Sequence, residues 1–142
     1  MIYTDLTKKA LKLCFSAHKE QVDKTGMPYV FHPFHLAEQM DDEISTVCAL
    51  LHDVVEDTDV SFDNLLDIGF SKEVIEVLKL LTHDKDVPYM DYVKKISTNA
   101  IAKKVKIADL KHNSDVTRLS VVDDVAKIRL SKYNQALELL LK

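Results

Sequence analysis

Apolar residues recur along the chain at the three- and four-residue spacing of an α-helix, and no segment keeps the two-residue alternation of a strand. Near the N-terminus, for example, Leu6, Ala10 and Leu13 fall on one face of a helix. The pattern predicts helices and no sheet, over about 4–22, 33–40, 42–57, 61–69, 71–80, 88–97, 99–115 and 122–141. We therefore expect an all-α fold that forms one compact helical bundle over residues 1–142.

Residues with strong positional preferences lie at the ends of these predicted helices. Thr4, Ser61 and Ser71 are suited to N-caps, and Gly69 is suited to the position after a helix C-terminus. Pro88 can open a helix, because a residue of the first turn needs no backbone N–H. The chain has only 2 glycines and 3 prolines, whereas sheet-rich domains need more turn residues than that. Composition therefore agrees with the periodicity.

Charge and cysteine content narrow the classes of protein to which the chain can belong. The net charge is -4, whereas a protein that binds a nucleic-acid polymer usually carries a basic excess. The apolar runs are too short to cross a membrane, and the N-terminus lacks the basic and apolar regions of a signal peptide. Cys14 and Cys48 lie far apart in apolar segments, which is typical of buried free thiols in a reducing compartment. We therefore expect a cytoplasmic protein without a membrane or nucleic-acid partner, and a small phosphorylated ligand stays possible.

The segment 49–58 carries the densest candidate chemistry, with four polar side chains between apolar ones: His52, Asp53, Glu56 and Asp57. On one continuous helix these side chains would project from one face, because residues four apart are neighbours. The three acids repel one another on a free surface, since no lysine or arginine lies between them. A divalent cation would relieve this repulsion, and histidine with aspartate suits Mn²⁺, Fe²⁺ or Zn²⁺.

The alternative for this segment is a solvated amphipathic helix, which periodicity alone does not exclude. A His-Asp pair is weak support by itself, because the chain contains a second one at His83 and Asp84. That pair lies in a charged stretch before Pro88, where we expect surface or helix-capping residues. Context, rather than the two residue types, distinguishes the pairs.

Two further segments hold candidate metal ligands. Asp109 interrupts an apolar helical line, where a buried carboxylate is costly unless it is paired or metal-bound, and Asn113 lies one turn later on the same face. The lysines around Asp109 can neutralise phosphate, although a lysine-rich helix face is more often simply solvated. His32 precedes Pro33, which favours an extended conformation at a helix entrance. For the remaining histidines of these regions we expect structural roles: His18, His35 and His112.

In this order the three segments resemble the hydrolase domain of the RelA/SpoT family, part of the HD superfamily, and in particular its small stand-alone alarmone hydrolases. The family's Ala-His-x-x-Gln-x-x-Lys-x-Gly-x-Pro-Tyr-x-x-His-Pro stretch corresponds to residues 17–33. Its Leu-Leu-His-Asp-Val-Val-Glu-Asp-Thr stretch is identical at 50–58, and its Lys-x-Ala-Asp-x-x-His-Asn stretch corresponds to 106–113. The resemblance extends from about Thr7 to Leu139.

This resemblance implies an HD-type bundle with a Mn²⁺ ion, or another divalent metal, that removes the 3′-pyrophosphate of guanosine-3′,5′-bis(diphosphate), the alarmone ppGpp of the stringent response. The partner implied is thus a small nucleotide, and the acidic pair would handle the attacking water. The residues implied are Glu56 and Asp57 for catalysis, Lys24, Asn113 and Tyr133 for substrate binding, and His32, His52, Asp53 and Asp109 for the metal.

Two positions depart from the family pattern. Asp23 and Asp115 stand where the family usually has arginine, so the resemblance predicts two anions in place of two cations near the nucleotide. This leaves two other readings open: an HD hydrolase for another nucleotide, and a non-catalytic module that senses a nucleotide. Product analysis distinguishes the enzymes, since removal of a diphosphate releases pyrophosphate and a monophosphatase releases orthophosphate.

Overall fold

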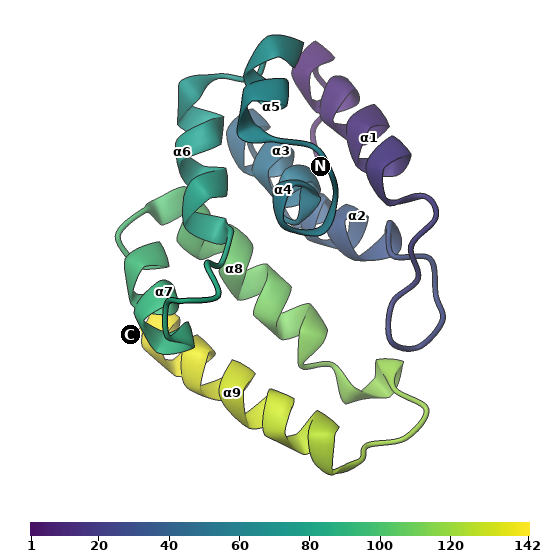
Figure 1. The fold of residues 1–142 in the computed structure, drawn as a ribbon, viewed down its shortest axis with the longest axis vertical. Helices are drawn as coiled ribbons and strands as arrows, with labels where there is room; N and C mark the ends of the chain where they lie inside the picture. The colour runs from purple at the N-terminus through teal and green to yellow at the C-terminus, as the bar shows by residue number, and fades with distance from the viewer.

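The computed structural model describes the whole chain, from Met1 to Lys142, as a bundle of α-helices without strands (Figure 1). Its elements are α1 (Asp5–His18), α2 (Phe31–Glu38), α3 (Glu43–Leu51), α4 (Val54–Asp57), α5 (Phe62–Ile68), α6 (Lys72–Leu81), α7 (Tyr89–Ile96), α8 (Ala100–Asn113), the 3-10 turn η1 (Val116–Arg118) and α9 (Asp124–Leu141). The only β-type pairing is an isolated bridge between Val22 and Pro28. The all-α prediction is therefore confirmed.

Local sequence sets most helix ends, as predicted. The side chains of Thr4, Ser61 and Ser71 each accept a bond from a backbone N–H of the first turn that they precede. Gly69 ends α5 with φ 117°, and Pro88 directly precedes α7. Because these caps satisfy N–H and C=O groups that a helix leaves unpaired, each helix starts or stops at a defined residue.

Three predicted boundaries are corrected by the structure. The segment 42–57 does not form one helix: α3 ends at Leu51, Asp53 leaves the helical region with φ −108° and ψ 0°, and α4 starts at Val54. The break buries the side chain of Val54 completely while Asp53 stays on a cavity wall. The first helix stops at His18, about four residues early. His32 is helical rather than extended, because α2 begins one residue before it.

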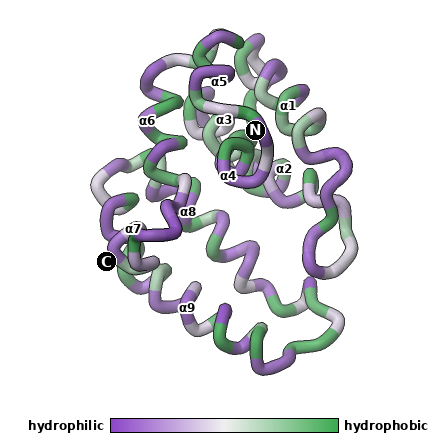
Figure 2. Tube along the Cα trace, in the orientation of Figure 1, coloured by the Kyte–Doolittle hydropathy of each residue, from purple (hydrophilic) through white to green (hydrophobic).

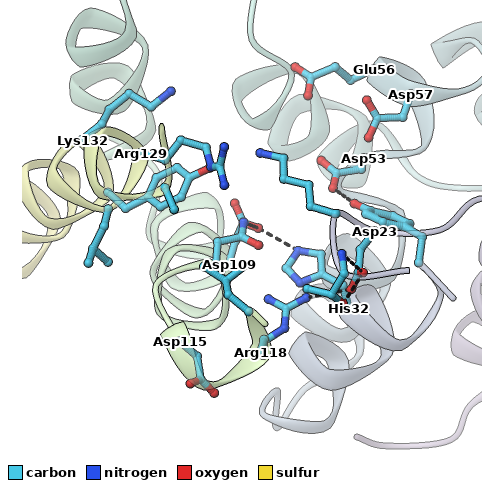
Figure 3. A pocket seen from close by; sticks show the side chains of 18 of the residues that line it. Asp23, His32, Asp53, Glu56, Asp57, Asp109, Asp115, Arg118, Arg129 and Lys132 are labelled. Atoms are coloured by element: carbon cyan, nitrogen blue, oxygen red, sulfur yellow. Dashed lines mark hydrogen bonds and ion pairs between the residues drawn. The ribbon is translucent and has the colours of Figure 1, made fainter. Parts of the chain in front are cut away.

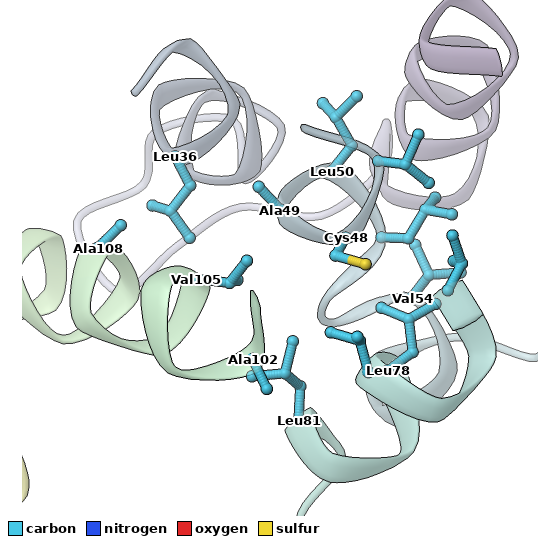
Figure 4. Packing of buried hydrophobic residues seen from close by; sticks show 14 of the residues in the cluster. Leu36, Cys48, Ala49, Leu50, Val54, Leu78, Leu81, Ala102, Val105 and Ala108 are labelled. Atoms are coloured by element: carbon cyan, nitrogen blue, oxygen red, sulfur yellow. The ribbon is translucent and has the colours of Figure 1, made fainter. Parts of the chain in front are cut away.

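The core surrounds α3, in which seven of nine residues are buried. It is one cluster of 27 buried residues, and every α-helix contributes to it. Figure 4 shows residues of α2, α6 and α8 around Cys48 and Ala49 of α3. Cys14 and Cys48 are free and buried, as predicted. The apolar core fixes α3, and therefore fixes the residues that follow its C-terminus.

The C-terminal helix α9 packs mainly on α7 and α8, at one side of the bundle (Figure 1). Hydrophobic and hydrophilic residues follow one another along every turn of α8 and α9 (Figure 2). Each helix can therefore present one face to the core and another to solvent or to a cavity. No helix combines the length and the apolarity that crossing a membrane requires.

Replacing Gly69 by alanine should lower the free energy of unfolding by about 1–2 kcal/mol, because a left-handed backbone is costly for a residue with a Cβ. The added Cβ would lie 3.4 Å from the flexible Lys9 Nζ, so the cost arises in the backbone. Urea unfolding followed by circular dichroism measures it. Asp67→Ala, at an exposed position of the same helix, is the control. Equal unfolding midpoints for the two variants would contradict this account.

Candidate functional site

A cavity of about 710 Å³ opens between the loop after α1, the helices α4, α7 and α8, and the inner face of α9. Figure 3 shows acidic and histidine side chains on one part of its wall, with arginine and lysine side chains facing them. All nine predicted site residues except His52 line this cavity. His52 lies directly behind the wall, because its Nε2 is 3.0 Å from the Asp53 carboxylate.

Three predicted ligands from three separate helical segments meet at one point of the wall. His32 Nε2 lies 2.9 Å from Asp109 Oδ1, and His52 Nε2 lies 3.6 Å from the same oxygen. All three side chains are buried. Their ligand atoms lie within 4.8 Å of one another, and the nitrogen–oxygen distances of 2.9 and 3.6 Å are short enough for one ion with bonds of about 2.1 Å to bridge them. The group of His32, His52 and Asp109 can therefore hold a metal ion.

The hydrogen bonds behind the two histidines leave their Nε2 atoms available as ligands. His52 Nδ1 lies 2.7 Å from the carbonyl oxygen of Ala49, which can only accept, so the proton sits on Nδ1. His32 Nδ1 lies 2.7 Å from His112 Nδ1, and burial and nearby cations lower the pKa of His112 to about 4. The neutral His112 ring can therefore accept a hydrogen bond from the N–H at His32 Nδ1. Such outer bonds are typical of metal-binding histidines.

Asp53 joins this group from the break between α3 and α4. Its Oδ2 lies 3.0 Å from His52 Nε2, and the hydroxyl of Tyr29 donates to the same oxygen. Burial opposes ionisation of Asp53, but His52 and Tyr29 lower the pKa of this carboxyl group to about 2. Asp53 is therefore an anion. Tyr29 lies in the first motif, and its role as the donor to Asp53 emerges only from the structure.

Asp109 is buried in the apolar line that it interrupts, where a carboxylate needs a partner or a metal ion. Burial would raise the pKa of Asp109, but Lys106 and the two histidines lower it well below its usual range. Lys106 Nζ lies 2.8 Å from Asp109 Oδ2, and Asn113 Nδ2 donates to Oδ1 at 3.0 Å. Lys106 is therefore largely buried and paired, whereas its neighbour Lys104 forms an exposed pair with Asp41.

The chemistry of the donors fits a divalent cation. His52 Nε2 is buried without a hydrogen-bond partner of acceptable geometry, although two carboxylates lie beside it. Burial lowers the pKa of His52, but Asp53 and Asp109 raise it well above its usual value. The carboxylates that favour a proton on Nε2 would equally favour a metal ion there. Imidazole nitrogens combined with carboxylate oxygens suit Mn²⁺, Fe²⁺ or Zn²⁺.

Glu56 and Asp57 form a second group with Asp53, with carboxylate oxygens within 4.8 Å of one another. The prediction that all four side chains project from one continuous helix is wrong, because His52 caps the C-terminus of α3 whereas Glu56 and Asp57 lie on α4. Burial, Asp53 and Glu56 raise the pKa of Asp57 to about 6. Glu56 Oε1 accepts a bond of 2.8 Å from the backbone N–H of His83.

The two residues of the second His-Asp pair, His83 and Asp84, lie in different environments. Asp84 is exposed and accepts from the backbone N–H of Asp86, in agreement with the surface prediction. His83 is half-buried, lines the cavity and positions Glu56, so its assignment to the surface is wrong. The three histidines expected to be structural do hydrogen-bond or stack near the site: His18, His35 and His112.

The three predicted substrate residues, Lys24, Asn113 and Tyr133, all line the cavity. Lys24 is mostly exposed, and the small part of it that is buried, together with the cations of Arg129 and Lys132, lowers its pKa. Lys132 lies over the rings of Tyr89 and Tyr133, at 4.6 and 5.6 Å from their centroids. Arg129 and Lys132 could not be predicted as cavity residues, because their helix carries no recognisable motif.

Asp23 and Asp115 do not face the cavity as free anions. Asp23 Oδ1 accepts from the backbone N–H groups of Thr25 and Met27, and its Oδ2 lies 3.3 Å from Arg118 Nη2. Asp115 accepts from Thr117 N and caps the turn η1. The expected excess of negative charge is therefore partly neutralised by Arg118, which sequence analysis did not single out.

Comparisons with known proteins agree with the motifs. No protein-family model matches the chain. The guanosine-3′,5′-bis(diphosphate) 3′-pyrophosphohydrolase MESH1 of Mus musculus is 32% identical over 114 residues, which cover 70% of this chain and 63% of that protein. MESH1 of Xenopus tropicalis is 28% identical over 92% of this chain and 79% of that protein. An Aquifex aeolicus enzyme named as a 3′-pyrophosphohydrolase of the same compound is 33% identical over 58% of this chain.

These relatives agree with the resemblance to RelA/SpoT-type hydrolase domains that the motifs indicate. The match spans less than two thirds of the mouse relative and 12% of the Aquifex relative. A solved structure of a metazoan ortholog of SpoT that hydrolyses ppGpp has the same fold, with a TM-score of 0.77 over 99% of this chain and 88% of that one. Sequence identity to that structure is 24%, so its fold, rather than its chemistry, is what the comparison transfers.

Proposed function

We propose that this protein is a Mn²⁺-dependent hydrolase that removes the 3′-pyrophosphate of ppGpp or pppGpp, with GDP or GTP and pyrophosphate as products. The observation that carries the proposal is the meeting of His32, His52 and Asp109 in a cavity large enough for a nucleotide. Asp53 lies beside His52 and joins this group to the carboxylates of Glu56 and Asp57. Similarity to relatives named as hydrolases of this compound supports the choice of substrate.

In this proposal the four ligands are His32, His52, Asp53 and Asp109. A divalent ion held by them would polarise the phosphate and make water more acidic. The short contacts from Tyr29 to Asp53 and from Lys106 to Asp109 hold the carboxylates in place. The site would then offer nitrogen and oxygen donors, a mixture that binds Mn²⁺ and also suits other divalent ions.

Glu56 and Asp57 are proposed to orient the attacking water and to accept its proton. Water oxygen forms a bond to the phosphorus next to the ribose, and the bond from that phosphorus to O3′ breaks. The oxygen O3′ then takes a proton, which completes GDP or GTP and leaves pyrophosphate. Both carboxylates lie beside Asp53, so each can reach a water next to the metal group, and the His83 N–H holds Glu56 in one orientation.

The cavity rim supplies the contacts for the nucleotide. Lys24 is proposed to offset phosphate charge together with Arg129 and Lys132 of α9, whose charges act on it and which line the same cavity. The exposed part of the Tyr133 ring offers an apolar surface for a base, and Asn113 offers an amide for hydrogen bonds. Asn113 also donates to Asp109, so this residue would connect the nucleotide to the metal group.

A product assay tests the proposed function. Purified protein with Mn²⁺ is expected to convert ppGpp to GDP and to release one pyrophosphate per GDP, because the bond to O3′ is the one that breaks. Chromatography of nucleotides together with separate assays of pyrophosphate and orthophosphate measures this. Orthophosphate from another nucleotide would favour a different hydrolase of the same type. Binding of ppGpp without turnover would contradict the enzyme proposal and favour a sensing module.

A further inference from the structure

Arg118 reaches the cavity wall from the turn between α8 and α9. Its Nη1 donates to the carbonyl oxygen of His112 at 2.9 Å, and its Nη2 donates to Asp23 Oδ2 at 3.3 Å. The side chain is 25% exposed, and Figure 3 shows its guanidinium group beside Asp23 and His32. A guanidinium group has five N–H donors, so further donors stay without a protein partner.

Several polar contacts hold this arginine in place. Asp115 accepts from the backbone and hydroxyl of Thr117 and so starts the 3-10 turn that carries Arg118. The carbonyl of His112 belongs to the last turn of α8, where the helix dipole favours a cation. Asp23 is itself fixed by the backbone of its loop. Arg118 is therefore positioned from both sides of the cavity.

The location of Arg118 is unfavourable for the proposed metal and favourable for an anion. A guanidinium group beside His32 repels any cation that His32 binds. The Asp23 carboxylate offsets this charge only through one ion pair on a partly exposed wall. A phosphate group that enters the cavity would meet a planar donor group suited to two parallel bonds.

We propose that Arg118 binds a phosphate group of the substrate next to His32, and that Asp23 competes with this phosphate for the guanidinium group. The inference rests on the proposed function in that the ligand carries phosphate. It adds a residue outside the three motifs that sets affinity, and it gives Asp23 two separate roles. Asp23 Oδ1 shapes the loop, whereas Asp23 Oδ2 holds Arg118 until the anion arrives.

Two substitutions with opposite expected effects test this inference. Arg118→Ala should weaken binding of inorganic pyrophosphate about tenfold, because a charge-assisted hydrogen-bond donor is lost. Asp23→Asn should tighten it about threefold, because an amide oxygen still accepts from Thr25 and Met27 while the competing charge is gone. Calorimetric titration of the proteins with pyrophosphate, at equal Mg²⁺ in cell and syringe, measures the affinities without turnover.

The alternative is that the Asp23–Arg118 pair only fastens the loop, in which case both variants weaken binding alike. That result, an unchanged affinity in Arg118→Ala, or no binding of pyrophosphate by the parent protein would overturn the inference. Arg118→Lys should recover part of the affinity because it keeps the charge. Lys111→Ala removes the same charge from an exposed position outside the cavity and should bind like the parent protein.

The same proteins separate this inference from the proposed function. If the opposite shifts in pyrophosphate affinity occur while ppGpp stays intact, Arg118 binds phosphate and the proposed activity is wrong. If the parent protein hydrolyses ppGpp and the shifts do not occur, the activity stands and the role of Arg118 is wrong. In an active protein, Arg118→Ala should raise KM and Asp23→Asn should lower it.

Discussion

Replacement of His52 by alanine is expected to remove divalent-metal binding and all measurable hydrolysis. His52 Nε2 lies 3.0 Å from Asp53 and 3.6 Å from Asp109, so its loss leaves two buried or half-buried carboxylates without the nitrogen that joins them. Loss of an outer partner of a metal ligand already costs about 10–100-fold in metal affinity, and loss of a ligand should cost more. Elemental analysis and calorimetric titration with Mn²⁺ measure the change.

A histidine outside the cluster provides the control for this experiment. His35 is exposed and its ring lies against that of His112 rather than at the ligand atoms, so His35→Ala should retain the metal. Circular dichroism of His52→Ala should show the helix content of the parent protein, since the 27 residues of the apolar core do not include the candidate metal ligands. A folded His52→Ala protein that keeps a full equivalent of tightly bound Mn²⁺ would refute the assignment of this ligand.

The second large effect is expected for Glu56→Gln, which should retain the metal and lower kcat by about 100-fold or more, as general-base catalysis contributes that much. Glutamine keeps the size of Glu56 and an oxygen that accepts from the His83 N–H, so the loop after α6 should stay in place. It cannot accept a proton. Metal content and steady-state kinetics, determined on the same preparation, separate these contributions.

Asp57→Asn distinguishes the two acids. Asp57 has the raised pKa, whereas Glu56 has the fixed hydrogen bond, so comparison of the two amides identifies which carboxylate takes the proton. If one of the two acids only orients the water, its conversion to the amide should lower kcat less than the same change at the acid that takes the proton. Parent-like kcat values for both variants would show that the acidic pair does not handle the water.

Much of the fold follows from local sequence, because helix formation and capping depend on residues three or four positions apart. Thr4, Ser61 and Ser71 start helices through their side chains, and Gly69 ends one through its backbone freedom. The pairing of Asp109 with Asn113 also follows from one helical turn. The family motifs named the four candidate ligands without showing how they meet.

Other features depend on contacts between segments that are distant in the sequence. The bond between His32 and Asp109 joins residues 77 positions apart, and the bond between Glu56 and His83 joins residues 27 apart. The break at Asp53 is likewise tertiary, because it buries Val54 in the core and leaves Asp53 next to Tyr29. Periodicity predicted one helix there, since it contains no information about either partner.

Local spacing and motif identity thus predict an all-α chain, its caps and the residue types of a candidate metal site. Contacts between distant segments, in contrast, bring Arg118 to Asp23, the His83 N–H to Glu56 and His32 to Asp109. These pairs form because packing of α3 against its neighbours brings separate chain segments to one cavity, where buried charges need partners.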